Sequence, residues 1–479
     1  MKRRTFLQSF AFGAAATSHA RERTYHVCLS PDALDADPDL LKVVQAAGVN
    51  AVWLPGFFYG YWPYSLDRIQ TWRRRIEKLG MEAHVANVPL GHPGDSLGAM
   101  HGEVPLTPPR RWKMGVAADG RSFSGTSLHS PAVEENRAAL RRLAGAGVRR
   151  VFLDDDFRLA RSPGTIGGCF CDAHIQSFAR RYGYSPAVKQ ELLDAVRGRN
   201  LTAVLRNWIG YQCDELTAAF RAIQAAAPQV RLGIMVMYLG AEKAGIRLAD
   251  YRDVPFRVGE LMFDDRSFAP VKGKTDELFS ALFHRRFARP ELAFSETTAF
   301  PSDKLSARNM AAKLAVSTLA DVRNTMFMSG LTPFPRSHWE TLGPAMRKQA
   351  AIHRRIAGHV PQGPFQHCWD EHSRMVGEDK PQSLFLASGI PFEVSPAPAA
   401  TALPESLAGL YRWKRAMTSK LHDIPYVEDD KPVVCAWYPA ARSVLLWNLS
   451  EGPETFSLVY RGSGRRVSVS GLDTELLVL

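Results

Sequence analysis

The sequence predicts an α/β fold, namely a (β/α)8 TIM barrel followed by a short linker region and a small C-terminal all-β domain. Eight short apolar segments, each followed by a segment with helical periodicity, succeed one another over about 335 residues, which is typical of a closed barrel. The loop after the first segment, Ser30–Leu34, contains no glycine, so an open nucleotide-binding sheet is disfavoured. From Pro432 onward the apolar period falls to about two, which predicts short β-strands.

The barrel elements follow from short apolar runs and from glycines that end amphipathic segments, such as Gly48 and Gly80. The expected strands are Tyr25–Leu29, Ala51–Leu54, Glu82–Ala86, Arg150–Leu153, Leu232–Val236, Val258–Met262, Glu291–Phe294 and Asn324–Met328. The expected helices are Leu40–Ala47, Ile69–Leu79, Pro131–Ala144, Leu201–Ala227, Leu278–Phe287, Arg308–Leu319 and His338–Ala357.

After the barrel, which we assign to residues 24–360, the composition changes. Residues 361–430 are rich in Pro, Gly and Ala and contain one strand-like piece, Ser383–Ala387. Residues 431–479 form the expected β module, with turn signals such as Gly462–Gly464 between strands. Its five expected strands are Val433–Trp437, Val444–Trp447, Phe456–Tyr460, Val467–Val469 and Leu476–Val478.

Composition excludes several classes of protein. Of 479 residues, 46% are hydrophobic and 23% charged, a globular profile rather than that of a disordered, collagen-like or coiled-coil chain. No apolar run reaches the roughly 20 residues of a membrane span, so we expect no stable membrane insertion. The net charge is +12, but the Lys and Arg residues are scattered over helical patterns, which favours solvated helix faces over a nucleic-acid partner. Six cysteines are too few for a disulfide scaffold, and the sequence leaves the oligomeric state open.

The N-terminus resembles a twin-arginine export signal. Arg3-Arg4 is followed one residue later by Phe6-Leu7, and an Ala-rich stretch leads to Ser18-His19-Ala20. Small residues at Ser18 and Ala20 stand where a signal peptidase reads its substrate. We therefore expect residues 1–20 to be removed and the mature chain to be periplasmic or extracellular.

Carboxylates and aromatic residues gather just past the expected strands. In a barrel enzyme the loops at these strand ends carry the chemistry. Aromatic faces pack on pyranose rings, and paired carboxylates act on a glycosidic bond, so the pattern predicts a carbohydrate substrate. The candidate substrate-binding residues are Phe57, Phe58, Tyr59, Tyr61, Trp62, Asn87, Arg158, Tyr238, Asp264 and Asp265.

The candidate catalytic residues are Asp154, Asp155 and Asp156 after the fourth strand and Glu296 after the seventh. Three adjacent like charges are unfavourable unless a ligand, metal or arginine compensates them, and Arg158 is close enough to do so. Our preferred assignment is Glu296 as nucleophile and Asp155 as general acid/base. Asp is one methylene shorter than Glu, which favours a longer separation between the Asp155 and Glu296 carboxyl groups. Retention and inversion therefore both remain open.

One segment after the fourth strand carries a family resemblance. The run Cys169-Phe170-Cys171-Asp172-Ala173-His174, followed by Phe178 and Tyr182-Gly183, resembles the corresponding segment of glycoside hydrolase family 42, the β-galactosidase-like barrels. The resemblance covers residues 24–360 and implies a clan A glycosidase with acids on strands four and seven. The short residues 361–430 do not match that family's longer trimerisation domain, whereas the terminal β module is similar to its small C-terminal domain.

The resemblance also implies a zinc site, because the family's Cys run binds zinc. Here Cys169, Cys171 and His174 would be ligands, with a fourth from His92, His101 or His129. Such a zinc would be structural, and we expect no cofactor to be required for catalysis. Two buried thiols or a local disulfide are the alternatives. The family's Asn-Glu pair on strand four is replaced here by acids alone, so Asp155 or Asp156 would take the acid/base role.

Two other functions remain open at this stage. A barrel without the usual acid/base Glu would suit a protein that binds carbohydrate without hydrolysing it. Alternatively, a strand-four Asp would act as nucleophile with Asp264 or Asp265 as acid, as in α-glycosidase barrels.

Overall fold

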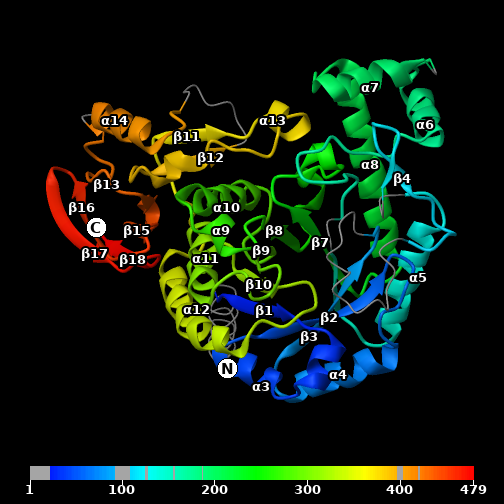
Figure 1. The fold of residues 1–479 in the computed structure, drawn as a ribbon, viewed down its shortest axis with the longest axis horizontal. Coiled ribbons are helices and arrows are strands. Elements are labelled where there is room, and N and C mark those ends of the chain that lie inside the picture. The colour runs from blue at the N-terminus through cyan, green and yellow to red at the C-terminus, as the bar shows by residue number, and fades with distance from the viewer. Residues whose placement is uncertain are drawn as a thin grey trace, which may run out of the picture.

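The computed structural model describes residues 22–91, 108–123, 128–154, 157–185, 187–395, 403–418 and 421–479. At its centre, eight parallel strands close into a barrel, because β1 pairs with β10 from Thr24↔Asn324 onward (Figure 1). The fold-class prediction is therefore confirmed. In chain order the barrel strands are β1 (Thr24–Cys28), β2 (Ala51–Phe58), β3 (Glu82–Val88), β6 (Arg150–Leu153), β7 (Arg231–Met237), β8 (Phe256–Gly259), β9 (Ala293–Thr298) and β10 (Asn324–Met328).

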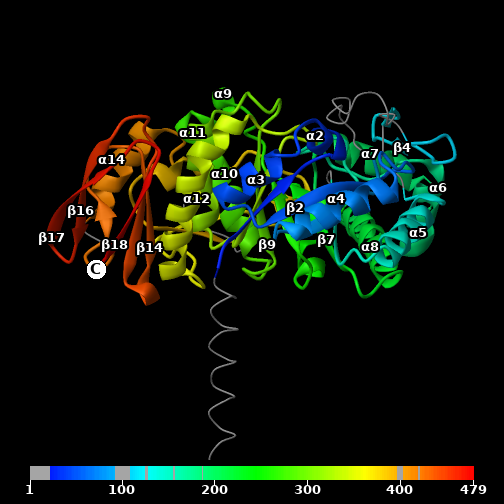
Figure 2. The same ribbon diagram turned by 90° about the horizontal axis from the view of Figure 1, so that it is seen from below.

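Amphipathic helices surround the barrel, and several begin at a side-chain cap. Ser65, Thr202 and Ser306 each accept a hydrogen bond from a backbone N–H of the helix that follows. The short helices α2 (Pro31–Ala36) and α9 (Asp265–Phe268) follow strands β1 and β8 and mark the C-terminal mouth, uppermost in Figure 2. The outer helices are α3 (Leu40–Ala47), α4 (Leu66–Lys78), α5 (Ala132–Gly145), α8 (Ala203–Ala225), α10 (Val271–Arg285), α11 (Ala307–Leu319) and α12 (Arg336–Ile356).

Of the barrel strands that differ from their expected bounds, two affect the mouth. Strand β8 covers Phe256–Gly259 and begins earlier than expected, whereas β9 runs on to Thr298. In each case a charged residue, Arg257 or Glu296, interrupts the apolar pattern. The interior of the barrel accepts these charges because they pair with one another. Glu296 therefore lies within β9 rather than on the loop after it.

A small lobe stands beside the mouth and was not expected from the sequence. It contains the hairpin β4 (Gly115–Val116)–β5 (Ser122–Phe123) and the helices α6 (Asp172–Tyr182) and α7 (Val188–Gly198). Its own core is a cluster of aromatic and aliphatic side chains packed on α8, including Phe178 and Trp208. Figure 1 shows α6 and α7 on the side of the molecule away from the C-terminal domain.

Residues 361–430 contain more regular structure than expected. Strands β11 (Phe365–Cys368) and β12 (Phe392–Ser395) pair in parallel, and helices α13 (Glu371–Met375) and α14 (Leu407–Met417) flank them. The expected strand Ser383–Ala387 is wrong, because this segment is a 3₁₀-helix packed on α10. The Ser383 hydroxyl donates to Asp276 and thereby ties this segment to the barrel. A five-residue apolar run does not by itself distinguish a strand from a buried helical turn.

The C-terminal domain confirms the five strands expected after Pro432. It contains two three-stranded antiparallel sheets, β14-β15-β18 and β13-β16-β17, around a core of its own (red in Figure 1). The strands are β13 (Tyr426–Val427), β14 (Val433–Tyr438), β15 (Ser443–Asn448), β16 (Glu454–Tyr460), β17 (Ser463–Val469) and β18 (Thr474–Val478).

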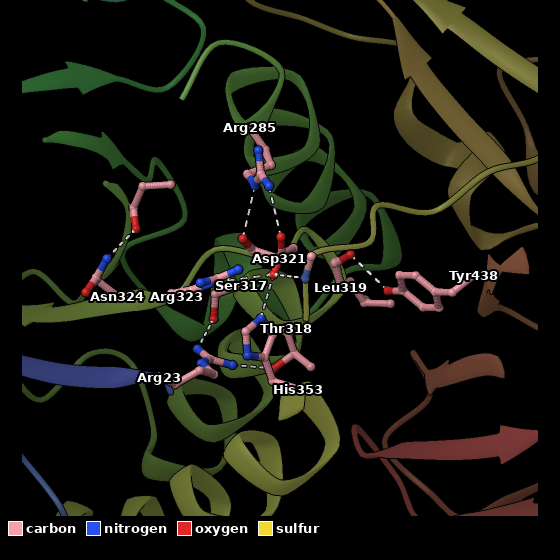
Figure 3. A network of polar contacts seen from close by, with 12 residues as sticks. Arg23, Arg285, Ser317, Thr318, Leu319, Asp321, Arg323, Asn324, His353 and Tyr438 are labelled. Atoms are coloured by element: carbon pink, nitrogen blue, oxygen red, sulfur yellow. Dashed lines mark hydrogen bonds and ion pairs between the residues drawn. The ribbon is translucent and has the colours of Figure 1, made fainter. Parts of the chain in front are cut away.

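A network around Asp321 holds the N-terminal end of the barrel to its helices and to the C-terminal domain (Figure 3). The Asp321 carboxylate accepts hydrogen bonds from Arg285 Nη2 at 2.9 Å and from His353 Nε2 at 2.9 Å. Nearby, the Tyr438 hydroxyl donates to the Leu319 carbonyl at 2.9 Å. In barrels this end serves stability, whereas the opposite end carries chemistry.

No helix among the described residues is both long enough and apolar enough to cross a membrane.

Candidate active site

One arginine joins the acids of two barrel strands. Arg257 on β8 faces Glu296 on β9, with 2.8 Å between Arg257 Nε and Glu296 Oε2. Its Nη2 also donates to Asp154 Oδ1, directly after β6. The second oxygen of Glu296 accepts a hydrogen bond from the Thr298 hydroxyl. The structure thus brings together the strand-four and strand-seven acids that the sequence singled out, although it links them through a residue that sequence reasoning missed.

The Arg257 cluster is deeply buried. Arg257 is 0% exposed, Asp154 2% and Glu296 3%. The guanidinium also lies 3.0 Å from Met235 Sδ and over the ring of Phe152. Two carboxylates thus share a single buried guanidinium. A buried cluster of ionisable groups from several barrel strands is a candidate functional site.

The loop next to Asp154 is fixed by Asn87. The Asp154 backbone N–H donates to the Asn87 carbonyl at 2.6 Å, and Asn87 Oδ1 accepts from the Phe57 N–H at 2.8 Å. Asn87 thereby ties together the ends of β2, β3 and β6. Its carbonyl and side-chain oxygen act here as backbone anchors. Asp155 and Asp156 lie outside the described residues.

The expected aromatic wall is largely packed into the protein. Phe57, Phe58 and Tyr59 are at most 4% exposed and belong to the main hydrophobic core. Tyr61 and Trp62 are only partly buried, but the Trp62 ring lies under the guanidinium of Arg142 on α5, 4.8 Å from its centroid. In this structure these rings hold β2 against its neighbours.

Three other predicted residues have structural contacts. Asp264 caps α9 by accepting from the Ser267 N–H, and Asp265 Oδ1 accepts from the Ser306 N–H at 2.8 Å. The Tyr238 hydroxyl donates to the Asp276 carbonyl on α10, and burial raises its pKa well above the ordinary value. None of these three contacts involves Arg257.

Arg158 lies at the mouth, where its Nη1 is 3.0 Å from Met237 Sδ at the end of β7. It is 5% exposed. The compensating role expected for Arg158 stays a prediction, because Asp155 and Asp156 lie outside the described residues.

A second buried acid cluster lies outside the barrel wall. Glu260, directly after β8, pairs with Lys313 of α11 at 2.5 Å, and Lys313 lies 3.4 Å from Glu277 of α10. Burial, reinforced by the neighbouring Glu277, raises the pKa of Glu260 well above its ordinary value. These three residues join β8 to its covering helices, so strand-end position alone did not identify which acids face the interior.

Four potential metal ligands meet at the base of the lobe. The ligand atoms of His129, Cys169, Cys171 and His174 all lie within 4.8 Å of one another. Cys171 Sγ is 3.3 Å from both His129 Nε2 and His174 Nδ1. The fourth residue is one of the three histidines proposed from the sequence, whereas His92 and His101 lie outside the described residues.

This donor set fits zinc. Two sulfurs and two imidazole nitrogens are the donors of a Cys₂His₂ zinc site, and the separations match ligands that share one ion. Burial, with a further contribution from His129, lowers the pKa of His174 to about 4, so its imidazole is neutral at pH 7, as a ligand must be. The four residues offer no open coordination position for substrate.

Comparisons with known proteins support the fold. No protein-family model and no curated protein sequence matches the chain. Among solved structures, a cold-adapted β-galactosidase from Rahnella sp. R3 has a TM-score of 0.59 and 11% identity, covering 95% of this chain and 98% of that one. A β-galactosidase from the psychrophilic Marinomonas ef1 has a TM-score of 0.58 and 10% identity, covering 95% and 99%. The chain therefore shares its barrel architecture with glycoside hydrolases over nearly its whole length.

Proposed function

We propose that the chain is an exported glycoside hydrolase that cleaves O-glycosidic bonds at the C-terminal mouth of the barrel. The observation that carries this proposal is the Asp154–Arg257–Glu296 cluster, in which acids from barrel strands four and seven meet on one guanidinium. Acids at these two strands are the pair that the family 42 resemblance implies, and structures of similar fold include β-galactosidases.

Within this proposal Glu296 is the nucleophile. Its backbone is fixed within β9, and the Thr298 hydroxyl and Arg257 orient its two oxygens. Arg257 supplies positive charge beside a group that has to attack as an anion.

The general acid is better assigned to a neighbour of Asp154 than to Asp154 itself. A contact with a guanidinium favours the charged form of a carboxyl group, whereas a general acid has to carry its proton at rest. Asp154 would then balance charge, and Asp155 or Asp156 would donate to the leaving oxygen.

A panel of aryl glycosides, assayed with the purified mature protein, tests the proposal. Turnover of at least one substrate is expected, and Glu296→Ala should abolish it while azide restores it as a substitute nucleophile. Asp264→Ala is the matched control, because that carboxylate caps α9, and it should keep near wild-type turnover in the folded protein. Absence of turnover across the panel, or full activity of Glu296→Ala, would contradict the proposal.

The second candidate is a barrel that binds carbohydrate without cleaving it. The burial of Glu296 and Asp154 and the packing of the Phe57–Tyr59 aromatics favour it, since a buried pair does not contact a sugar in this conformation. Saccharide binding that protects the protein against thermal unfolding, without release of any reducing sugar, would select this function.

We also propose that His129, Cys169, Cys171 and His174 hold one structural zinc. The ion would neutralise the two thiolates and join the start of α6 to residue 129 ahead of α5. Metal analysis of freshly purified protein should find about one zinc per chain. Cys171→Ser should remove it, whereas Cys213→Ser, a buried cysteine on α8, should not. Absence of metal from the wild-type protein would leave the thiol interpretation.

Export by the twin-arginine route is a further part of the proposal, supported by the sequence of residues 1–20. Replacing Arg3 and Arg4 together by Lys should keep the precursor in the cytoplasm, as fractionation and N-terminal sequencing would reveal. Normal processing after Ala20 in that variant would contradict this route.

A further inference from the structure

A large cleft opens between the loop after β6 and the small lobe. Its volume is 910 Å³, within the range of about 300–1,000 Å³ that small-molecule and cofactor sites occupy. The loop after β6, the β4–β5 hairpin, the end of α7 and residues 378–380 line it. Leu159 and Leu261 also line it. Leu159 lies on the loop after β6, beyond Asp154, and Leu261 lies just after β8, the strand that carries Arg257. The cleft therefore lies among the loops that follow the barrel strands β6 and β8.

The acidic side chains of the cleft are each matched by a cation. Asp379 pairs with the buried Lys243 at 2.7 Å, and Glu378 pairs with Lys380 at 2.5 Å. The third acid, Asp119, faces Arg121 at 3.9 Å. These carboxylates consequently contribute little net negative charge to the cleft.

Two arginines of the cleft have no such match. Among the residues that the structure describes, neither Arg161 nor Arg199 forms an ion pair with a carboxylate. Arg161 is exposed on the loop after β6. Arg199 is held by backbone carbonyls alone, with Nη2 donating to Gly164 at 2.7 Å and to Gly377 at 2.8 Å. Its Nε also donates to the Val376 carbonyl, and its charge helps to lower the pKa of the Glu378 carboxyl, whereas its Nη1 makes no hydrogen bond to a described residue.

The backbone at Arg199 supports a role beyond packing. Arg199 ends α7 in the left-handed region with φ 51°, a position that glycine normally occupies. A side chain there is strained by about 1 kcal/mol or more, and such strain is concentrated at ligand sites. The strained backbone holds the guanidinium at the lip of the cleft.

We infer that this cleft binds an anionic sugar unit, so that the saccharide substrate is acidic. Guanidinium groups pair with planar carboxylates and with sulfate oxygens by charged, often bidentate hydrogen bonds. Uronic acids and sulfated sugars both present such a group. This inference rests on the proposed glycosidase function, whose substrate class it names.

Binding of three hexasaccharides to the full-length protein, measured by calorimetry, tests the inference. We expect hexagalacturonate or a sulfated galactohexaose to bind at least about tenfold more tightly than neutral galactohexaose, because a charge-assisted hydrogen bond contributes that much. The two acidic ligands distinguish a carboxylate site from a sulfate site. Equal binding of all three would overturn the inference.

Arg161→Gln gives the residue-level test, and Arg465→Gln on the exposed strand β17 is its matched control, since each removes one surface charge. Arg161→Gln should weaken acidic-ligand binding about tenfold and leave neutral-ligand binding unchanged. An equal loss in Arg465→Gln would indicate only general attraction of a polyanion and would overturn the site. Because the readout is binding, an acidic ligand that binds but is never cleaved rejects the glycosidase and keeps the cleft. Cleavage of aryl glycosides without preference for acidic ligands keeps the glycosidase function and rejects the anionic-sugar site.

Discussion

The two ends of the barrel each contain a buried acid cluster, and their charge balances differ. At the mouth, two carboxylates, Asp154 and Glu296, share one guanidinium, that of Arg257. At the opposite end, the single carboxylate of Asp321 accepts hydrogen bonds from Arg285, His353 and the Gly358 N–H. The same residue types thus place two carboxylates on one cation at the mouth, and three hydrogen-bond donors on one carboxylate at the opposite end.

This difference teaches which acids to associate with chemistry. Burial raises the pKa of Asp321 by itself, but hydrogen bonds from His353 and Arg285 outweigh it and hold the pKa below the ordinary value. An acid so satisfied has no capacity left for a substrate. Glu296 has one ion pair and one hydroxyl donor, and its cation is shared.

The largest expected effect is on catalysis at the mouth. Glu296→Gln should lower kcat on an activated glycoside by at least about a thousandfold, because an amide is not a nucleophile. Its unfolding free energy should change by only about 1 kcal/mol, since the amide can turn its oxygen to Arg257 and its NH₂ to the Thr298 hydroxyl. Steady-state kinetics and urea denaturation measure the two quantities. A large loss of stability with retained kcat would make Glu296 a structural residue like Asp321.

Asp321→Asn should have the opposite profile. It leaves the buried Arg285 without its carboxylate, so the unfolding free energy should fall by about 3–5 kcal/mol. Turnover per folded molecule should stay at the wild-type value, because the network lies at the far end of the barrel. A loss of kcat in the folded variant would show that the two ends are coupled.

The Asp321 network should also make the free energy of unfolding depend on pH. Burial lowers the pKa of His353 from the ordinary 6.5, and the hydrogen bond to Asp321 opposes this only in part. Below pH 6.5 the unfolded chain therefore binds a proton that the folded chain does not, and stability falls as pH falls. The slope is about 1.4 kcal/mol per pH unit for one such group. Denaturation between pH 7.5 and about 5 measures it, and His353→Gln should reduce the proton uptake by about one. An unchanged slope in that variant would place the effect on other buried histidines.

The smallest expected effect concerns the contact between the barrel and the C-terminal domain. Tyr438→Phe removes the hydrogen bond to the Leu319 carbonyl and should lower the unfolding free energy by about 1 kcal/mol. Calorimetry should record the same number of unfolding transitions for this variant as for the wild-type protein. Separation into two transitions would show that this hydroxyl governs the coupling of the domains.

Much of the fold was predictable, because local patterns encode it. The apolar periodicity and the residues that end each element predicted both bounds of the helix Leu40–Ala47 and of the strand Asn324–Met328 correctly. The prediction failed where a charge lies inside a strand, as at Arg257, since a single sequence does not show which partner compensates it. It also failed at Ser383–Ala387, where packing on α10 selected a helical turn over a strand.

The sequence by itself determined the order of the strands, the two-layer β module and the residue types available at the mouth, because these depend on periodicity along the chain. It also singled out the Cys169–His174 segment, whereas the structure selected His129 from the three histidines that the sequence left open. Only the tertiary structure decided which acids meet. Arg257, 103 residues from Asp154, contacts both Asp154 and Glu296. Asp264 instead caps α9, and Asp265 accepts a hydrogen bond from Ser306. Barrel closure sets these distances, and closure depends on hydrogen bonds between strands that are remote in sequence.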